Sequence, residues 1–252
     1  MEKLCDLLFE LSNESRFGIL RALSLKPLKL TEVSKTLDAT PQETSRNLHR
    51  LAEQSLLERR PDGCYTLTPY GRYCLGQLDG LDFLTRNAEY FLSHTLMDIP
   101  VKFRHRIGAL RKARLVSDVM KMFNDTKKMI GDAEERVWIM SDQVLMSTLP
   151  ALHEAVERGV EFRLIMPIDF DPPSDFEEHI ERSAWTRRSF DRKSLKSFRC
   201  LIVLTEKEAQ VTFKTKEGRI DYLGFSVEDQ EGLNWCSDFF TWCWDEAEAC
   251  PQ

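Results

Sequence analysis

Apolar residues recur at helical spacing through the N-terminal third of the chain, interrupted by short polar turns. Segments 3–12 and 14–24 repeat apolar positions every three or four residues, which predicts two helices. After a short strand expected at 27–30, segment 31–39 continues as a short amphipathic helix that ends in a tight turn. The predicted core positions of the first two helices are Leu4, Leu8, Ile19, Leu20 and Leu23.

The next helix, expected over residues 40–54, carries its own start signals. Thr40 fits the N-cap, Pro41 the first helical position, and Glu43 completes a capping box. Two short β-rich runs then flank the turn 61–63, which contains the Asp-Gly pair typical of hairpins. Helix, turn, helix and hairpin in this order place one helix in the major groove and a wing on the flanking backbone. The sequence therefore predicts binding to double-stranded DNA.

After the hairpin, an apolar stripe runs from about Pro69 to His94 and predicts one long helix. The stripe is longer than a small module can cover, so we expect it to pair with its mate in a twofold homodimer. The alternative is a linker helix that packs on its own C-terminal domain. The apolar positions of the stripe include Tyr73, Leu78, Leu81, Leu84, Ala88 and Phe91.

The pattern changes near residues 97–100, so we expect two domains, 1–96 and 97–252. Beyond the boundary, helices alternate with short apolar strands, which predicts an α/β domain and an α+β chain as a whole. The expected helices cover 101–133, 145–159, 174–183 and 229–249, and the expected strands cover 137–141, 160–167, 198–205, 208–215 and 218–226.

Composition sets limits on this picture. No apolar run approaches the ~20 residues that span a bilayer, and acids appear early at the N-terminus, so we expect a cytoplasmic protein with no membrane partner. The net charge is −6, but residues 1–75 hold 11 Lys or Arg against 10 Asp or Glu. A near-neutral module binds DNA when its basic side chains gather on one face.

The seven cysteines are irregularly spaced and include no CxxC pair, which argues against a disulfide framework or a zinc ribbon. Cys236, Cys243 and Cys250 recur every seven residues. On a helix that spacing rises roughly 10 Å, beyond the reach of a disulfide. We interpret these three as small buried apolar residues, with redox sensing as the alternative.

The candidate base-reading side chains lie on the exposed face of the helix 40–54. Arginine forks onto guanine, and Gln and Asn pair with adenine, whereas Leu48 and Leu51 are expected to point inward. The candidate base-reading residues are Gln42, Thr44, Ser45, Arg46, Asn47, His49 and Arg50, and the candidate backbone or minor-groove contacts are Arg59 and Arg60 in the wing, with Lys29 and Lys35.

Two basic clusters lie outside this module: Lys102, Arg104, His105, Arg106, Arg111, Lys112 and Arg114, and Arg182, Arg187, Arg188, Arg192, Lys193, Lys196 and Arg199. The plain interpretation is solvated surface, and the first cluster has the alternative of contacting DNA beside the module. In the second, Arg forks suit phosphate or carboxylate. We expect a small anionic effector or a partner protein at Arg187, Arg188, Arg192 and Lys193. The competing contact surface is the aromatic final helix, although such a stripe usually packs inward.

The first domain resembles the ArsR-like winged-helix transcriptional regulators in the motifs NESRFGILRAL, TEVSKTLDATPQETSRNLHRLAEQSLLERR and LTPYGRYCL. The second half is similar to an archaeal, methanogen-centred family of such regulators in VWIMSDQ, AVERGVEFRLIMP, CLIVLTEKEAQVTF and the segment 218–247. In fold, this second domain is similar to phospholipase-D-like domains. The resemblance implies a C-terminal sensor or effector domain of that fold.

Phospholipase-D catalysis needs a His nucleophile, a Lys two residues later and an Asp five beyond that. None of the chain's five histidines has Lys at the second following position, and Phe198, Cys200 and Thr205 occupy the motif positions on the equivalent strand. We therefore expect no enzyme activity. The helix 31–39 has no cysteine and the long helix has one histidine, His94, so we expect neither metal nor cofactor.

Taken as a whole, the sequence predicts a homodimeric transcription regulator that reads a roughly palindromic operator and has a non-catalytic, ligand- or partner-sensing C-terminal domain. One alternative is a phosphodiesterase or nuclease with an appended DNA-binding module, and the missing His-Lys-Asp set argues against it. Another is a protein-interaction adaptor with a vestigial helix-turn-helix, which a lack of DNA binding would favour.

Overall fold

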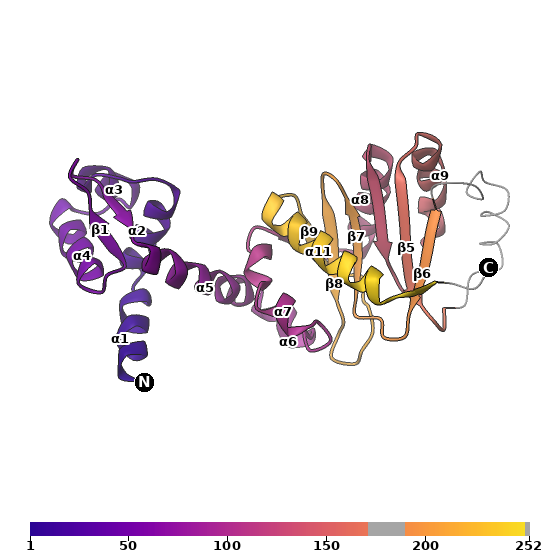
Figure 1. The fold of residues 1–252 in the computed structure, drawn as a ribbon, viewed down its shortest axis with the longest axis horizontal. Helices are drawn as coiled ribbons and strands as arrows, with labels where there is room; N and C mark the ends of the chain where they lie inside the picture. The colour runs from indigo at the N-terminus through magenta and orange to yellow at the C-terminus, as the bar shows by residue number, and fades with distance from the viewer. Residues whose placement is uncertain (171–189, 250–252) are drawn as a thin grey trace. The chain divides into compact units, whose positions relative to one another are not determined.

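The computed structural model describes residues 1–170 and 190–249 and divides the chain into two compact units, Met1–Asp79 and Gly80–Gln252 (Figure 1). The division falls inside helix α5 (Pro69–Arg86) rather than at the predicted boundary between residues 96 and 97. The reason is that Phe83 and Tyr90 are buried in the core of the second unit. The predicted boundary was therefore placed too late in the chain.

The first unit is a helix-turn-helix with a β-hairpin. Its core joins Ile19 and Leu20 of one helix to Val33, Leu48 and Leu51 of the next two, and all five are buried. The predicted inward positions Leu48 and Leu51 are thus confirmed. The elements are α1 (Glu2–Leu11), α2 (Glu14–Leu25), α3 (Leu30–Thr36), α4 (Pro41–Glu53), β1 (Leu57–Arg59), β2 (Tyr65–Leu67) and the first part of α5.

Helix α1 differs from expectation. Leu4 and Leu8 were predicted core residues, but their side chains are 57% and 46% exposed. The helix contributes Leu11, at its C-terminal end, to the first core instead. Its apolar stripe is real, but most of it lies outside the core of this unit. The short strand expected at 27–30 is reduced to a single bridge between Leu28 and Tyr65.

The predicted helix 69–94 is interrupted. Helix α5 ends at Arg86, and α6 (Ala88–Ser93) begins after Asn87. The side-chain amide of Asn87 donates a hydrogen bond to the backbone carbonyl of Phe83 (2.8 Å). Asparagine competes in this way for backbone groups and is unfavourable inside helices.

The second unit is built on a mixed sheet that, within the described residues, has eight strands in the order β10-β6-β5-β4-β7-β8-β9-β3. The pairs β4–β5 and β5–β6 are parallel and the others are antiparallel. Helices α8 and α9 cover one face and α11 crosses the other (Figure 1). The remaining elements are α7 (Val101–Arg104), η1 (Ile107–Leu110), β3 (Arg114–Val116), α8 (Val119–Asp132), β4 (Arg136–Met140), η2 (Met146–Thr148), α9 (Leu149–Glu157), β5 (Glu161–Pro167), β6 (Phe190–Leu195), β7 (Cys200–Thr205), β8 (Ala209–Phe213), β9 (Gly224–Val227), α11 (Gln230–Glu246) and β10 (Glu248–Ala249).

Two predicted elements of this unit were wrong in extent. The segment 101–133 was expected to be one helix, but it forms α7, η1 and α8, with the edge strand β3 between η1 and α8. At the N-cap of α8, the Asp118 carboxylate accepts hydrogen bonds from the amides of Met120 and Lys121. The strand expected over 218–226 is confined to β9. Strand β6 was not predicted, and the helix expected at 174–183 lies outside the described residues.

The core of the second unit includes residues of the sheet and of α11. Trp235, Phe239 and Phe240 of this helix are fully buried, which confirms that the aromatic stripe packs inward. Cys236 and Cys243 are buried beside them, as predicted, and burial raises the pKa of both thiols. Cys250 lies outside the described residues.

Two glycines of α5 give a matched test of how closely this helix approaches Leu56 in the first unit. A Cβ at Gly71 would lie 1.9 Å from the Leu56 carbonyl oxygen, whereas nothing lies within 4 Å of a Cβ at Gly76. Gly71→Ala should destabilise the first unit by about 1–3 kcal/mol through overpacking. Gly76→Ala should stabilise it by up to about 1 kcal/mol through helix propensity.

Urea unfolding of the full chain, followed by far-UV circular dichroism, measures both effects. All five tryptophans lie beyond residue 80, so tryptophan fluorescence monitors the second unit alone and serves as the internal control. Equal shifts for the two variants would contradict the close approach of α5 to Leu56.

Candidate nucleic-acid interface

Local hydrogen bonds fix the starts of both helices of the helix-turn-helix, α3 and α4. The Lys29 amide donates to the Glu32 carboxylate (2.7 Å) at the start of α3. Asp38 takes a positive φ of 49° in the turn, and the Thr40 hydroxyl accepts from the Glu43 amide (3.2 Å) at the start of α4. The predicted N-cap is therefore confirmed, and it fixes the direction in which α4 leaves the turn.

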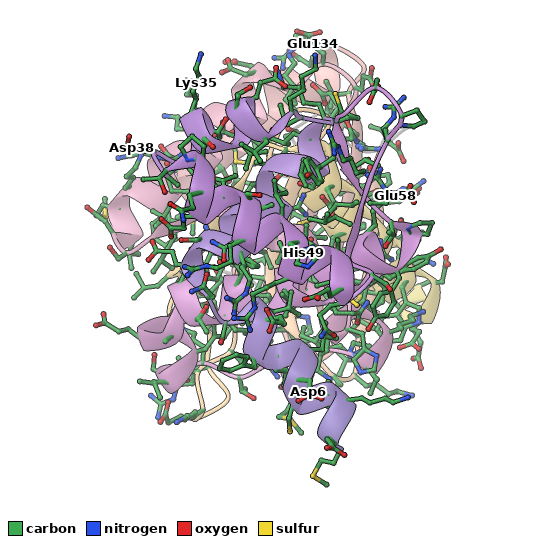
Figure 2. The ribbon with its side chains drawn as sticks, turned by 90° about the vertical axis from the view of Figure 1, so that its left-hand side faces the viewer. Asp6, Lys35, Asp38, His49, Glu58 and Glu134 are labelled. Carbon is green, nitrogen blue, oxygen red and sulfur yellow. The ribbon has the colours of Figure 1, made fainter. Side chains whose placement is uncertain are left out.

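Helix α4 exposes four of the seven predicted base-reading side chains: Gln42, Ser45, Arg46 and His49. His49 projects from α4 in Figure 2, with Lys35 of α3 and Glu58 of β1 also labelled in that view. The His49 ring lies 3.3 Å from the Glu53 carboxylate, one turn further along the helix. These side chains supply both donors and acceptors, as base reading requires.

Thr44 and Asn47 were wrongly predicted to face outward. Their side chains are buried, with Thr44 only 1% and Asn47 6% exposed. The Ser34 hydroxyl donates to the Thr44 hydroxyl (3.0 Å), which joins α3 to α4. Thr44 lies four residues before Leu48 and Asn47 four residues before Leu51, so each shares a helix side with a buried leucine. The Thr44 hydroxyl therefore stabilises the contact between α3 and α4.

Arg50 is committed to an internal ion pair. Its guanidinium donates to both carboxylate oxygens of Glu10, at 2.5 and 3.2 Å. The Glu10 side chain also lies 2.9 Å from Arg16, and both Glu10 and Arg16 are buried. The hydrogen bond to Glu10 raises the pKa of Arg50. Arg50 therefore ties α4 to α1, a role that its sequence context did not predict.

The wing is a tight hairpin in which β1 and β2 pair from Leu57–Leu67 to Arg59–Tyr65. Gly63 takes a φ of +81°, which favours glycine, and its amide donates to the Arg60 carbonyl (2.9 Å). The Asp62 carboxylate accepts from the Cys64 amide (3.0 Å), and this bond lowers the pKa of Asp62. The hairpin signal in the sequence is therefore confirmed.

Both wing arginines are exposed, as are Lys29 and Lys35. The Arg59 guanidinium lies 6.0 Å from the centre of the Tyr65 ring, and that of Arg60 lies 3.7 Å from the Asp62 carboxylate. Such exposed pairs contribute little stability.

On the sheet, the positions of the phospholipase-D motif carry no nucleophile pair. Phe198 is 9% and Cys200 0% exposed, and burial raises the pKa of the Cys200 thiol well above its usual range. The Thr205 hydroxyl donates to the Glu208 carbonyl (3.1 Å). Phe198 and Cys200 are therefore buried packing residues, and Thr205 stabilises the turn after β7.

Of the predicted anion site, Arg192 and Lys193 lie in the described part of the chain. Arg192 and Lys193 are successive residues of β6, so their side chains leave opposite faces of the strand. Lys193 donates to the Trp244 carbonyl (2.9 Å) and lies over the Trp244 ring. Arg187 and Arg188 lie outside the described residues.

Acidic residues of α11 pair with members of both basic clusters. Within the first cluster, Arg106 meets Asp238 (2.8 Å) and Arg111 meets Glu231 (2.6 Å). Arg199 of the second cluster meets Glu246 (3.1 Å). These pairs favour the plain interpretation of the clusters as surface charge, neutralised within the sheet domain.

The described residues define a helix-turn-helix with a β-hairpin, followed through α5 by a mixed α/β sheet domain. The predicted α+β fold class is confirmed. The family model described as the HVO_A0261 N-terminal domain matches residues 5–88. No curated protein matches the chain. Among the described residues, no helix has both the length and the apolar character needed to cross a bilayer.

Solved structures match at low identity. The chain is similar to TrmBL2, described as an archaeal chromatin protein with a novel mode of DNA binding, at 14% identity over 94% of each chain and a TM-score of 0.46. It is similar to NucT from Helicobacter pylori at 10% identity, with 55% of this chain and 97% of that chain covered and a TM-score of 0.44. It is also similar to Nuc from Salmonella typhimurium, a phospholipase D family member, at 9% identity and a TM-score of 0.39. That match covers 52% of this chain and 91% of the other.

Proposed function

We propose that this protein is a DNA-binding transcription regulator, related to the ArsR-like regulators and to the archaeal, methanogen-centred family that its motifs resemble. The observation that carries the proposal is the exposed polar face of α4, with Gln42, Ser45, Arg46 and His49. This face belongs to a helix-turn-helix whose hairpin exposes two further arginines. Helix and hairpin offer one surface for base edges and another for the backbone.

We further propose that the regulator is a homodimer. Tyr73 and Leu81, two positions of the apolar stripe predicted from the sequence, are 75% and 57% exposed in α5. Large apolar side chains on one exposed helix face are typical of a contact with a second helix. A twofold dimer would place two α4 helices about 34 Å apart and match a roughly palindromic operator.

The sheet domain, in this proposal, is a sensor without catalysis. Support comes from Phe198, Cys200 and Thr205, which stand where phosphodiester chemistry needs a His nucleophile, a Lys and an Asp. The competing proposal is a phosphodiesterase or nuclease with an appended DNA-binding module.

Arg46→Ala should weaken binding to a selected duplex by about 1–3 kcal/mol if Arg46 contacts a base. Arg46→Lys keeps the charge but loses the planar fork, so it should retain nonspecific binding and lose most of the specific affinity. Arg59→Ala should weaken all sequences alike and reduce the salt slope by about one unit. Fluorescence anisotropy on duplexes selected with the purified full chain measures all three.

Arg219→Ala is the matched control, because Arg219 is an exposed arginine of the sheet domain that lies outside both basic clusters. Arg50→Ala is unsuitable as a simple contact test, since it leaves Glu10 without one of its two partners. Full-strength binding by Arg46→Ala would remove α4 as the reading helix. Failure to select any duplex would favour the adaptor hypothesis.

Replacing Tyr73 and Leu81 together by Glu should separate the dimer, because the two carboxylates would be buried without partners at the contact. Sedimentation velocity measures the change. The control is Leu25→Glu, which alters a leucine of α2 that is even more exposed, at 86%. An unchanged sedimentation coefficient for the double variant would mean that another surface makes the dimer, or that the chain is a monomer.

Incubation of the purified protein with a chromogenic phosphodiester should release product at the rate of buffer alone. Turnover that is lost on substitution of one polar residue of the sheet domain would overturn the non-catalytic proposal and favour the phosphodiesterase.

A further inference from the structure

The sheet domain has a polar pocket of about 350 Å³ at the edge where the parallel strands β4, β5 and β6 end. Asp142 is the second residue after β4 and Asp169 the second after β5, so two carboxylates line the pocket from equivalent positions on neighbouring strands. Two ammonium groups also line it, from Lys196 directly after β6 and Lys214 directly after β8. Ligands of open α/β sheets commonly bind outside the carboxyl ends of the parallel strands.

The segment 196–199 forms one wall of this pocket and joins β6 to β7, which are separated in the sheet by β5 and β4. The three strand spacings that it crosses amount to roughly 14 Å, and the chain from Leu195 to Cys200 reaches at most about 17 Å. The segment is therefore nearly extended and cannot fold down over the ends of β4 and β5. Strand order also reverses here, with β5 and β6 on one side of β4 and β7 on the other, which is the position of a ligand-binding crevice in such sheets.

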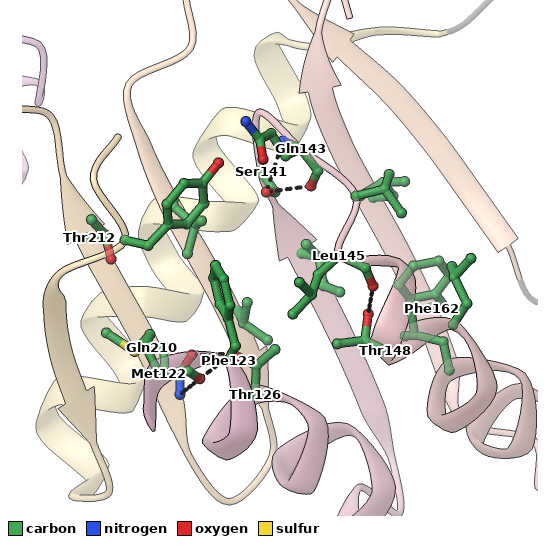
Figure 3. Close-up of a pocket in the computed structure, with 18 residues that line it drawn as sticks. Met122, Phe123, Thr126, Ser141, Gln143, Leu145, Thr148, Phe162, Gln210 and Thr212 are labelled. Atoms are coloured by element: carbon green, nitrogen blue, oxygen red, sulfur yellow. Dashed lines mark hydrogen bonds between the residues drawn. The ribbon is translucent and has the colours of Figure 1, made fainter. Parts of the chain in front are cut away.

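Asp142 is held in place by its surroundings. The Tyr222 hydroxyl donates to its carboxylate (3.1 Å). The residues on either side close a tight turn, in which the Ser141 hydroxyl donates to the Gln143 carbonyl (2.7 Å) and accepts from the Gln143 amide (3.2 Å). Figure 3, centred on a separate apolar cavity of the sheet domain, shows this turn. Partial burial raises the pKa of Asp142, and the Tyr222 hydrogen bond and the positive charge of Lys214 act against that rise. A cationic group bound beside this fixed carboxylate would favour its charged form further.

The two lysines of the pocket have exposed partners. Lys214 Nζ lies 3.2 Å from the Asp98 carboxylate, and Lys196 Nζ lies 2.7 Å from that of Glu248. The side chains of Asp98 and Glu248 are 45% and 59% exposed, and exposed ion pairs contribute little stability. A carboxylate that enters the pocket can therefore replace either partner at little cost.

We propose that this pocket binds a small zwitterion of the α-amino-acid class with an apolar side chain, whose ammonium group is held by the two pocket aspartates and whose carboxylate is held by the two pocket lysines. A ligand with a single charge would match one pair and meet like charges at the other. Phe198 and Ile220 add apolar lining for the side chain, and the volume suits a small molecule. This ligand class differs from the anionic effector that the sequence predicted.

Lys214 also connects the pocket to the segment that follows α6. Its carbonyl accepts from the Thr95 amide (2.8 Å) and its side chain pairs with Asp98, so both hold the segment 95–98. A ligand carboxylate that takes Lys214 from Asp98 releases one of these two attachments. This segment continues α5 and α6, so the ligand shifts DNA affinity, and DNA shifts ligand affinity by the same factor. The regulatory step rests on the proposed function, whereas the binding does not.

Isothermal titration calorimetry with the full chain tests the binding. The probes are L-leucine and L-phenylalanine, their analogues without the amino group (isocaproate and hydrocinnamate) and their analogues without the carboxylate (isoamylamine and phenethylamine). At least one of the two amino acids should bind saturably with Kd below about 1 mM, and both of its analogues should bind at least about 10-fold more weakly. Inorganic phosphate, the probe for a plain anion site, should not bind.

Two substitutions at one ion pair should have opposite effects on this affinity. Lys214→Met removes a partner of the ligand carboxylate and should weaken binding by about 10-fold or more. Asp98→Asn removes the competing carboxylate and should tighten binding by about 2- to 5-fold. A purely structural role of the pair would make both substitutions weaken binding. Asp142→Asn keeps an acceptor for the Tyr222 hydroxyl but removes the charge, so it should weaken binding by about 10-fold.

The matched controls are Lys216→Met and Asp245→Asn, which alter an exposed lysine and an exposed aspartate outside the pocket and should leave the affinity unchanged. Weaker binding by Asp98→Asn overturns the proposal, as does equal binding of an amino acid and its amine analogue, or the absence of saturable binding by both amino acids. Phosphate binding that Lys214→Met abolishes would overturn it in favour of a plain anion site. If Lys214→Met fails to fold, Asp98→Asn and the analogues decide.

DNA affinity is measured separately, with and without a saturating amino acid. Binding of the amino acid by a protein that selects no duplex leaves the pocket assignment standing and removes the proposed function. Binding that leaves the affinity for a selected duplex unchanged removes the regulatory coupling alone.

Discussion

The packing of aromatic rings around Phe225 holds the end of α5 and the whole of α6 inside the sheet domain. The Phe225 ring centre lies 5.0 Å from that of Phe83 and 4.9 Å from that of Tyr90. The Tyr90 hydroxyl also accepts from the Phe213 amide, so the same side chain is fixed by packing and by hydrogen bonds. Because α5 contributes Leu75 to the first core and Phe83 to the second, this one helix carries the chain from one core into the other. Any communication through the backbone has to pass along it.

The ion pairs described above each join two residues of the same unit. Exposed ion pairs contribute little stability, but they decide which basic groups remain available to a polyanion. In the sheet domain, α11 supplies carboxylates to arginines at 106, 111 and 199. In the helix-turn-helix unit, Arg46 and the wing arginines keep their exposure. The negative net charge of the chain is therefore compatible with a local basic surface on the first unit.

Local patterns predicted the helix-turn-helix, the hairpin and most strands, because capping, turn chemistry and periodicity act within a few residues. They failed where a polar side chain has a buried partner: Thr44 was predicted outward because the sequence does not show Ser34 beside it. The pairing of Arg50 with Glu10 spans 40 positions and leaves no local signal. Strand β3 has three residues, too few for alternation to be recognised. An apolar cavity in the sheet domain is lined by residues of β4, β5, β7, β8, α8 and α9, so its size cannot be read from any one segment of the sequence.

The distribution of thiols has a practical consequence. The cysteines of the first unit, Cys5, Cys64 and Cys74, are exposed or half-buried, whereas Cys200, Cys236 and Cys243 of the sheet domain are buried. Alkylation requires an accessible thiolate, and burial disfavours both access and ionisation. Under native conditions a thiol-reactive dye or spin label would therefore attach first to the helix-turn-helix unit among these six residues. The chain thus carries natural attachment points on the unit proposed to meet DNA, and labelling there requires no engineered cysteine.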